Sequence, residues 1–255
     1  MTNHNISEQR NPGSELPRGI YLLPNLLTTS GLFAGFYAMV AAMRGDFEHA
    51  AIAIFIAMLM DGLDGRVARL TNTESAFGAQ YDSLADIVSF GLAPSLVVYS
   101  WGLISLGKIG WLSAFFYAAG TALRLARFNT QIETQDKRYF QGLPCPAEAG
   151  FVAGMVWVAH EYGVPGHRLW DLACIVTLVT GALMVSNLRY YSFKEVDLKG
   201  KVPFVTVLAF LILFVFVSID PPQVLLMGFG LYVFSGPSLA LFRWFSAWRK
   251  KRTRQ

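Results

Sequence analysis

The stretch Asp61-Gly-Leu-Asp-Gly-Arg-Val-Ala-Arg-Leu-Thr-Asn-Thr-Glu-Ser-Ala-Phe-Gly-Ala-Gln-Tyr-Asp-Ser-Leu-Ala-Asp86 carries four aspartates between two apolar segments. Asp61 and Asp64 are three residues apart, and Asp82 and Asp86 are four apart, so each pair shares one face of a helix. Placing an ionisable side chain in an apolar membrane helix costs free energy, so such a residue usually has a functional role. The stretch therefore predicts two antiparallel helices that set two carboxylate pairs opposite each other.

The composition excludes a soluble domain of this length. Of the 255 residues, 54% are hydrophobic and 15% are charged, whereas charged residues usually make up roughly a quarter of a soluble protein. A helix of about 20 apolar residues crosses a bilayer, and helices satisfy their own backbone in lipid. We predict an all-α polytopic membrane protein with eight transmembrane helices. Their approximate ranges are 20–43, 47–71, 76–105, 108–128, 146–164, 168–188, 202–219 and 222–247.

The distribution of basic residues predicts the orientation. With eight crossings both termini lie on one side, which then holds all the lysines and arginines except Arg44, Lys108 and Arg168. Because cytoplasmic loops are enriched in basic residues, we expect both termini and the aspartates to face the cytoplasm. The net charge of +4 gives no reason to expect a nucleic-acid partner.

The chain divides into one membrane domain and two short tails. We expect a polar cytoplasmic tail over 1–17, a single transmembrane catalytic domain over 18–248 and a basic cytoplasmic tail over 249–255. The first apolar run is too long for a signal peptide and is expected to be retained. The basic tail is expected to lie against anionic lipid headgroups. A simple orientation signal is an equal alternative and is compatible with that role.

The four aspartates predict a divalent-metal site, because carboxylates this close repel one another unless cations neutralise them. Hard oxygen ligands suit Mg²⁺ or Mn²⁺, and two ions about 4 Å apart would stabilise displacement at phosphorus. The neighbouring small residues Gly65, Ala68 and Gly78 leave two interpretations open. They admit a nucleotide close to the backbone, or they allow two membrane helices to pack tightly.

These residues resemble the CDP-alcohol phosphotransferase family, whose pattern is D-x2-D-G-x2-A-R-x8-G-x3-D-x3-D. The sequence matches it at every fixed position and every gap. The resemblance implies the family's fold, a homodimer and two divalent ions. It implies metal ligation by Asp61, Asp64, Asp82 and Asp86, with Asp86 also acting as the general base. The residues implied to bind the CDP-lipid are Gly65, Ala68, Arg69, Ser75, Gly78, Asn25 and Thr28.

Other stretches resemble bacterial members of this family that use L-serine as the acceptor. They are 23–28, 82–94, 123–129, 140–147 and 186–194. The resemblance implies that CDP-diacylglycerol and L-serine react to give phosphatidylserine and CMP in a bacterial inner membrane. Glycerol phosphate or inositol phosphate as the acceptor is an alternative. A divalent-cation transporter is a second alternative, but its transit site would lie near the bilayer midplane.

Serine has a carboxylate, and arginine forms bidentate bonds to carboxylates. We expect the serine-binding residues among Arg124, Arg127, Asn129 and Arg189, although Arg127 and Arg189 could equally serve as cytoplasmic anchors. Asn25, Asn129, Glu148 and Asn187 could line the pocket. A structural hydrogen bond is the favoured single explanation for each of these four.

Overall fold

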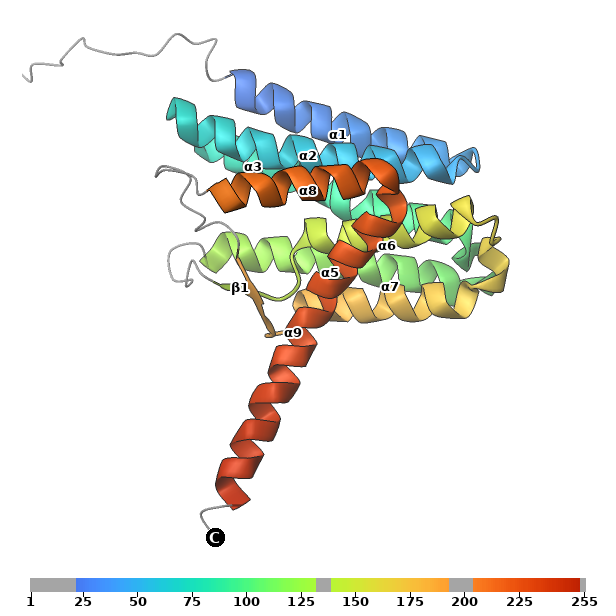
Figure 1. The fold of residues 1–255 in the computed structure, drawn as a ribbon. Coiled ribbons are helices and arrows are strands. Elements are labelled where there is room, and N and C mark those ends of the chain that lie inside the picture. The colour runs from blue at the N-terminus through green and yellow to red at the C-terminus, as the bar shows by residue number, and fades with distance from the viewer. Residues whose placement is uncertain (1–21, 132–138, 193–203, 253–255) are drawn as a thin grey trace, which may run out of the picture.

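The computed structural model describes residues 22–131, 139–192 and 204–252. Each of the eight predicted apolar segments contains a helix in this described part, and most of these helices run side by side in a bundle (Figure 1). The predicted tail 1–17 lies outside the described residues, as do the last three residues of the predicted tail 249–255. The expectation of a mostly helical protein is confirmed.

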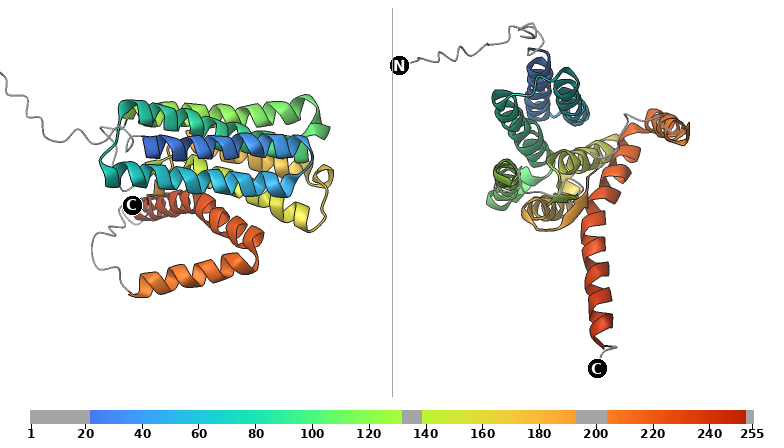
Figure 2. Two further views of the ribbon diagram at one scale, coloured as in Figure 1. Left: turned by 90° about the horizontal axis from the view of Figure 1, so that it is seen from above. Right: turned by 90° about the vertical axis from the view of Figure 1, so that its left-hand side faces the viewer.

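The elements follow one another in a simple order. They are α1 (Leu22–Met43), α2 (Phe47–Thr71), α3 (Ala76–Asp86), η2 (Ile87–Leu92), α4 (Ala93–Trp101), η3 (Leu103–Leu106), α5 (Lys108–Gln131), β1 (Tyr139–Gln141), α6 (Cys145–Glu161), η4 (Gly166–Arg168), α7 (Trp170–Val185), β2 (Arg189–Tyr191), α8 (Phe204–Ile219) and α9 (Pro221–Arg252). Helix α9 runs past its predicted end at residue 247 and so includes the start of the predicted basic tail. Figure 2 shows that the C-terminal part of α9 leaves the bundle.

The third predicted helix is not one continuous α-helix. Residues 87–92, which form η2, are π-helical and separate α3 from α4. Pro94 stands in the first turn of α4 and has no N–H to donate to the carbonyl four residues earlier. That carbonyl belongs to Phe90, and it accepts instead from the hydroxyl of Tyr117 at 3.3 Å. The proline therefore supplies a local reason for the change in helix geometry.

Helices α1 and α2 form a closely packed antiparallel pair (Figure 1). Their buried residues are mostly small: Ala34, Ala38, Ala41 and Ala42 in α1, and Ala50, Ala51, Ala53 and Ala57 in α2. Inside lipid, burying apolar side chains does little to stabilise helix association. Close van der Waals packing between small residues stabilises it instead. The alanines therefore bring α2, which carries the first carboxylate pair, against α1.

Helix η2 contacts α1 at two glycines four residues apart. The Ser89 hydroxyl donates to the Gly31 carbonyl at 3.1 Å. At Gly35 a Cβ atom would lie 2.6 Å from Ser89 Oγ and 2.7 Å from Ser89 Cα. Only glycine permits this approach without displacing one of the two helices, so Gly35 sets the distance between α1 and the segment that follows Asp86.

A short two-stranded sheet, absent from the sequence expectation, connects the second half of the bundle. Strands β1 and β2 are antiparallel, with Phe140 opposite Tyr190. Gly142 follows β1 with a φ of 78°, and its N–H donates to the Leu188 carbonyl at 2.8 Å. The Tyr190 hydroxyl donates to the Val233 carbonyl of α9 at 3.1 Å. The sheet thus fixes the chain that leads into α6.

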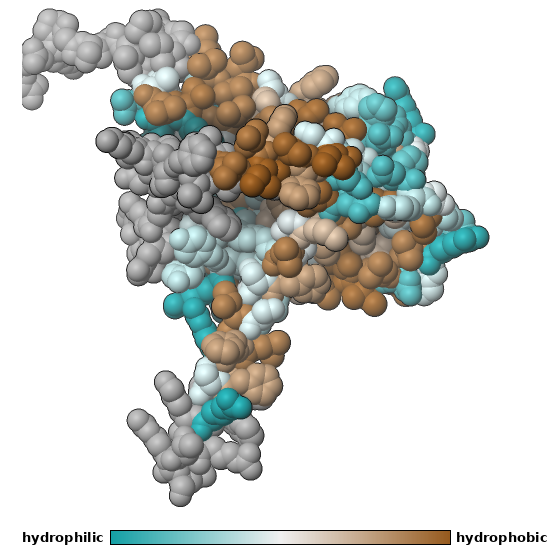
Figure 3. Space-filling model, viewed as in Figure 1, coloured by the Kyte–Doolittle hydropathy of each residue, from teal (hydrophilic) through white to brown (hydrophobic). Residues whose placement is uncertain are grey.

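Three helices in the described part are long and apolar enough to cross a membrane: Leu22–Met43, Ala76–Trp101 and Pro221–Arg243. Helices α6, α7 and α8 have 17, 16 and 16 residues. At 1.5 Å per residue they extend about 24–26 Å, less than the hydrocarbon thickness of about 30 Å. Helix α2 is long enough but contains charged residues of the motif. Large apolar side chains are exposed on the bundle, and Figure 3 shows apolar surface over α1 and α8.

Substituting Gly35 with alanine should destabilise the bundle, because the added methyl group would overlap Ser89. Overpacking of this kind costs about 1–3 kcal/mol. We expect Gly35→Ala to lower the melting temperature in detergent, measured by tryptophan fluorescence. The matched control is Gly228→Ala in α9, where a Cβ atom would meet nothing within 4 Å. Equal melting temperatures for the two variants would contradict the tight contact.

Candidate active site

The turn between α2 and α3 brings the two carboxylate pairs together. Helix α2 ends because Asn72 adopts a left-handed conformation (φ 53°), with its N–H directed to the carbonyls of Ala68 and Arg69. Ser75 directly precedes α3, and its hydroxyl caps the helix by accepting from the Gly78 N–H at 3.0 Å. The short turn reverses the chain, so the last part of α2 faces α3.

Three of the four aspartates form one cluster. One carboxylate oxygen from each of Asp61, Asp64 and Asp82 lies within 4.8 Å of the other two. Asp64 is only 5% exposed, and the other two are half-buried. Asp86 lines the same cavity and lies within electrostatic range of all three. The predicted convergence of the two pairs is therefore present in the structure.

Helix α1 forms the third wall of this cavity. The Thr28 hydroxyl lies 2.6 Å from an Asp64 carboxylate oxygen, to which it donates a hydrogen bond. The side-chain oxygen of Asn25 is near Gly78, where an added Cβ atom would lie 3.6 Å from it. The Thr29 hydroxyl pairs with the Tyr81 hydroxyl at 2.8 Å. Three successive polar positions of α1 therefore meet α2 and α3.

The cluster fits a divalent ion by the chemistry of its donors. The three carboxylates and the nearby Thr28 hydroxyl offer hard oxygen atoms, the kind that Mg²⁺ and Mn²⁺ prefer. The Thr28 hydrogen bond orients one carboxylate, as groups around metal ligands commonly do. The family that the motif resembles depends on divalent metal. We therefore assign this cavity as the candidate metal centre.

The remaining motif residues lie at the open end of α2 and the start of α3. Arg69 is exposed, and its guanidinium would lie 3.5 Å from a Cβ atom added at Gly65. Ala68 is half-buried beside it. Ser75 caps α3, which gives its hydroxyl a structural role beside the implied contact with a donor phosphate. These positions leave an accessible surface next to the carboxylates.

The four residues considered for serine lie in different surroundings. Arg124 is 8% exposed, and its Nη1 donates to Cys145 Sγ at 3.2 Å. The Asn129 amide donates to the Ser83 hydroxyl at 3.0 Å, next to Asp82 in the chain. Arg189 is exposed on β2. Only Arg124 combines burial with electrostatic proximity to Asp86.

Arg127 has a structural role. Its guanidinium donates to the carbonyls of Met184, Val185 and Ser186 and to that of Gln141, at 3.0–3.2 Å. It also lies 3.4 Å from the side-chain oxygen of Asn187, which accepts from the Gln141 amide at 2.8 Å. Arg127 thus joins α5 to the end of β1 and to the last turn of α7 with the residue that follows it. These bonds use its donors, so we do not propose it as a substrate ligand.

Glu148 has no hydrogen bond of normal geometry in the described part of the chain, although the Thr180 hydroxyl lies near its carboxylate. Glu148 is fully buried in the first turn of α6, yet neither carboxylate oxygen has a hydrogen-bond partner among the described residues. The Nε of Arg124 is also buried without a partner in this part of the chain. The two side chains lie within electrostatic range of each other. The sequence signal was a lone acid after two prolines, which gave no indication of this burial.

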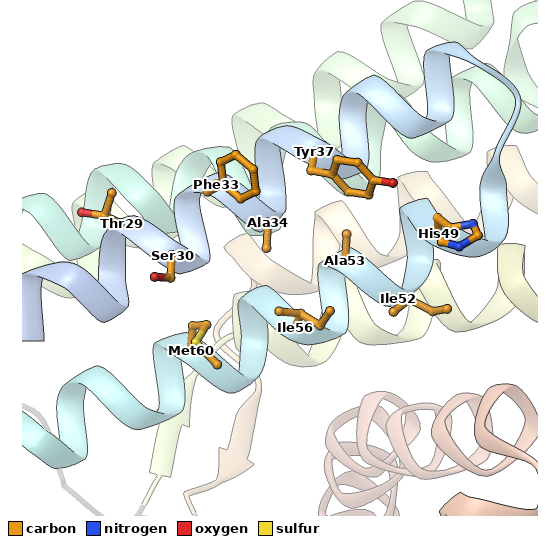
Figure 4. A pocket seen from close by; sticks show the side chains of 10 residues that line it. All are labelled: Thr29, Ser30, Phe33, Ala34, Tyr37, His49, Ile52, Ala53, Ile56 and Met60. Atoms are coloured by element: carbon orange, nitrogen blue, oxygen red, sulfur yellow. The ribbon is translucent and has the colours of Figure 1, made fainter.

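A groove of about 570 Å³ lies between α1 and α2, beside the carboxylate cavity (Figure 4). Figure 4 shows Ser30 of α1 directed toward Met60 of α2, and Ala34 directed toward Ile56. The groove is lined by Thr29, Ser30, Phe33, Ala34, Tyr37, His49, Ile52, Ala53, Ile56 and Met60. Most of these side chains are apolar. Because Met60 precedes Asp61 in the chain, one end of the groove adjoins the carboxylates.

The chain belongs to the CDP-alcohol phosphatidyltransferase family, whose pattern it matches over residues 21–185. It is therefore an enzyme of the class that transfers a phosphatidyl group from a CDP-linked donor to an alcohol.

Several relatives carry a more specific name, CDP-diacylglycerol--serine O-phosphatidyltransferase. The relative from Helicobacter pylori (strain ATCC 700392 / 26695) is 41% identical over 226 residues, which is 88% of this chain and 92% of the relative. The relative from Bacillus subtilis (strain 168) is 34% identical over 173 residues, covering 68% of this chain and 92% of the relative. That from Mycobacterium leprae (strain TN) is 34% identical over 182 residues, with coverages of 69% and 60%.

Removing the Thr28 hydroxyl should weaken metal binding, because Asp64 would lose the group that orients it. Loss of such a supporting bond typically costs about 10–100-fold in metal affinity. We expect Thr28→Val to need correspondingly more Mn²⁺ for the same rise in melting temperature, and Asp64→Asn to show no rise. Thr177→Val is the control, since this buried threonine bonds only within its own helix, to the Ala173 carbonyl. Identical Mn²⁺ titrations of the wild type and Thr28→Val would contradict the assignment.

Proposed function

We propose that this enzyme transfers the phosphatidyl group of CDP-diacylglycerol to the hydroxyl of L-serine, giving phosphatidylserine and CMP. The carboxylate cluster beside a groove between membrane helices carries the proposal. The names and coverage of the relatives support serine as the acceptor. The phosphorus attached to diacylglycerol gains a bond to the serine oxygen and loses its bond to the CMP oxygen.

Asp86 is the proposed general base. A serine hydroxyl is a weak nucleophile at neutral pH and needs a positioned base. Asp86 lines the cavity, but it is not one of the three residues whose oxygens form the tight cluster. Its carboxylate can therefore accept the serine proton while the other three hold metal. We also assign Asp86 a metal contact, in line with the motif.

The donor is proposed to lie across the end of α2. Gly65 and Ala68 would contact the cytidine, and Arg69 and Ser75 the phosphates, with Asn25, Thr28 and Gly78 completing the wall. Two divalent ions, Mg²⁺ or Mn²⁺, would be held by Asp61, Asp64, Asp82 and Asp86. Bound metal would offset the negative charge that develops on the diphosphate. An acyl chain of the donor fits the apolar groove between α1 and α2 and would remain in contact with lipid.

We propose that the eight helical segments all cross a bacterial inner membrane, with α3, η2 and α4 together forming one crossing. Both termini and the active site would face the cytoplasm, as the distribution of basic residues favours. The domain limits stay at 18 and 248, with basic residues beyond 248 near lipid headgroups. A homodimer is proposed from the family resemblance.

Serine-dependent release of CMP is the central prediction. The purified chain in mixed micelles with CDP-diacylglycerol and Mn²⁺ or Mg²⁺ should release CMP when L-serine is added, and phosphatidylserine should form in equal amount. Glycerol phosphate and inositol phosphate should give little CMP. Preference for either of these acceptors would refute serine. Cation flux in proteoliposomes without any CDP-lipid would instead support a transporter.

Asp86→Asn should lower kcat about 10²–10⁴-fold, the usual contribution of a general base. The KM for CDP-diacylglycerol should change little, because the other three carboxylates are intact. Asp61→Asn, Asp64→Asn and Asp82→Asn should abolish turnover by removing a metal ligand. The measurement is steady-state CMP release at saturating serine. Near-normal turnover by Asp86→Asn would rule out its role as the base.

A further inference from the structure

Glu148 is the buried acid that the proposed reaction leaves unexplained. It is fully buried, and both of its carboxylate oxygens lack partners among the described residues. The Thr180 hydroxyl lies close enough to interact with this carboxylate, but its proton is directed to the Val176 carbonyl of its own helix at 2.8 Å. Burying a carboxylate without hydrogen bonds costs several kcal/mol. The site therefore has two strong acceptor atoms that the surrounding described residues do not use.

Arg124 supplies complementary donor capacity next to this acid. Its Nη1 bonds only to a thiol, which is a weak acceptor, and its Nε is buried without a partner among the described residues. The described residues contain no ion pair between Arg124 and Glu148. A positive and a negative side chain that are not paired with each other can each bind the opposite charge of a small zwitterionic molecule.

Arg124 and Glu148 lie on helices that pack near Asp86, the proposed general base. Arg124 is on α5 and Glu148 on α6, and both helices pack against η2, the segment that begins directly after Asp86. Arg124 and Cys145 both lie within electrostatic range of Asp86. Cys145 is in contact with Arg124 and precedes Glu148 by three residues. The pair therefore lies where α5 and α6 pack against the segment that follows Asp86.

We propose that Glu148 binds the ammonium group of the acceptor amino acid while Arg124 binds its carboxylate. The hydroxyl would then point toward Asp86. This inference rests on the proposed function and deepens it: the two opposite charges select a small zwitterionic hydroxy acid over alcohols that lack either charge. Glu148 thereby becomes a determinant of acceptor specificity.

The surrounding structure supports a fixed position for both side chains. Arg127 holds the end of α5 to carbonyls in the last turn of α7. Gly142, at φ 78°, directs the chain from β1 into α6, where a Cβ atom would lie 2.1 Å from the Met184 carbonyl oxygen. The carbonyl thus leaves no room for a larger residue. Both helices that carry the pair are therefore held against the last turn of α7, at the Met184 carbonyl.

The test compares Glu148→Gln with the wild type in serine-dependent CMP release. Removing the charge should raise the KM for L-serine at least about tenfold, since a hydrogen bond between charged groups is lost. The KM for CDP-diacylglycerol should stay the same. Inhibition by 3-hydroxypropionate, which is serine without its ammonium group, should not change. Glu161→Gln is the matched control, because Glu161 is exposed at the other end of the same helix.

Each outcome decides between the proposals. An unchanged KM for serine, or an equal loss of affinity for serine and 3-hydroxypropionate, would overturn the role of Glu148. If Glu148→Gln does not fold, Glu148→Asp serves as the second variant, because it keeps the charge but moves it away from the ligand. An unchanged KM for serine in Glu148→Asp would again overturn the role of Glu148. Failure of the wild type to release CMP with serine would refute the proposed function instead.

Discussion

The mutual repulsion of four carboxylates is the constraint around which this structure is organised. Asp61, Asp64, Asp82 and Asp86 share one small cavity inside an apolar bundle, where charge is poorly solvated. The turn at Asn72 and the cap at Ser75 hold α2 and α3 in the antiparallel arrangement that forces them together. Divalent cations in the proposed metal centre would relieve this repulsion, and their binding would then stabilise the fold.

Helix α1 makes this arrangement rigid. Its alanines pack on α2, Gly31 and Gly35 admit Ser89, and Thr28 reaches Asp64. One helix therefore contacts the segments that carry both carboxylate pairs. Helix α1 also borders the apolar groove, which runs along its contact with α2. The same helix can thus relate the position of a lipid chain to the position of the carboxylates.

Much of this arrangement was predictable from the sequence, because apolar runs of helical length and acids spaced by one helical turn are local signals. All eight helical segments and the meeting of the two carboxylate pairs follow from them. The π-helical segment was not predictable, since it depends on Pro94 together with a contact between Tyr117 and Phe90 that are distant in sequence. The backbone contacts of Arg127 and the burial of Glu148 likewise depend on tertiary packing. From side-chain type alone, Arg127 was expected to bind substrate or to anchor the helix at the membrane surface. Glu148 was expected to line the pocket with a structural hydrogen bond.

The π-helical segment 87–92 also lets the side chains before and after it point in directions that a continuous α-helix would not allow together. Before it, α3 must aim Asp82 and Asp86 at α2; after it, α4 must turn Val97 and Val98 into the core, where both are fully buried. In a continuous α-helix each residue advances the side-chain direction by about 100°, so the two directions would be locked together. Widening one turn lets the helix take up an extra residue there. Losing a single residue from this segment would therefore turn the core-facing side of α4 by about a quarter of a revolution or more, even though no charged group had changed.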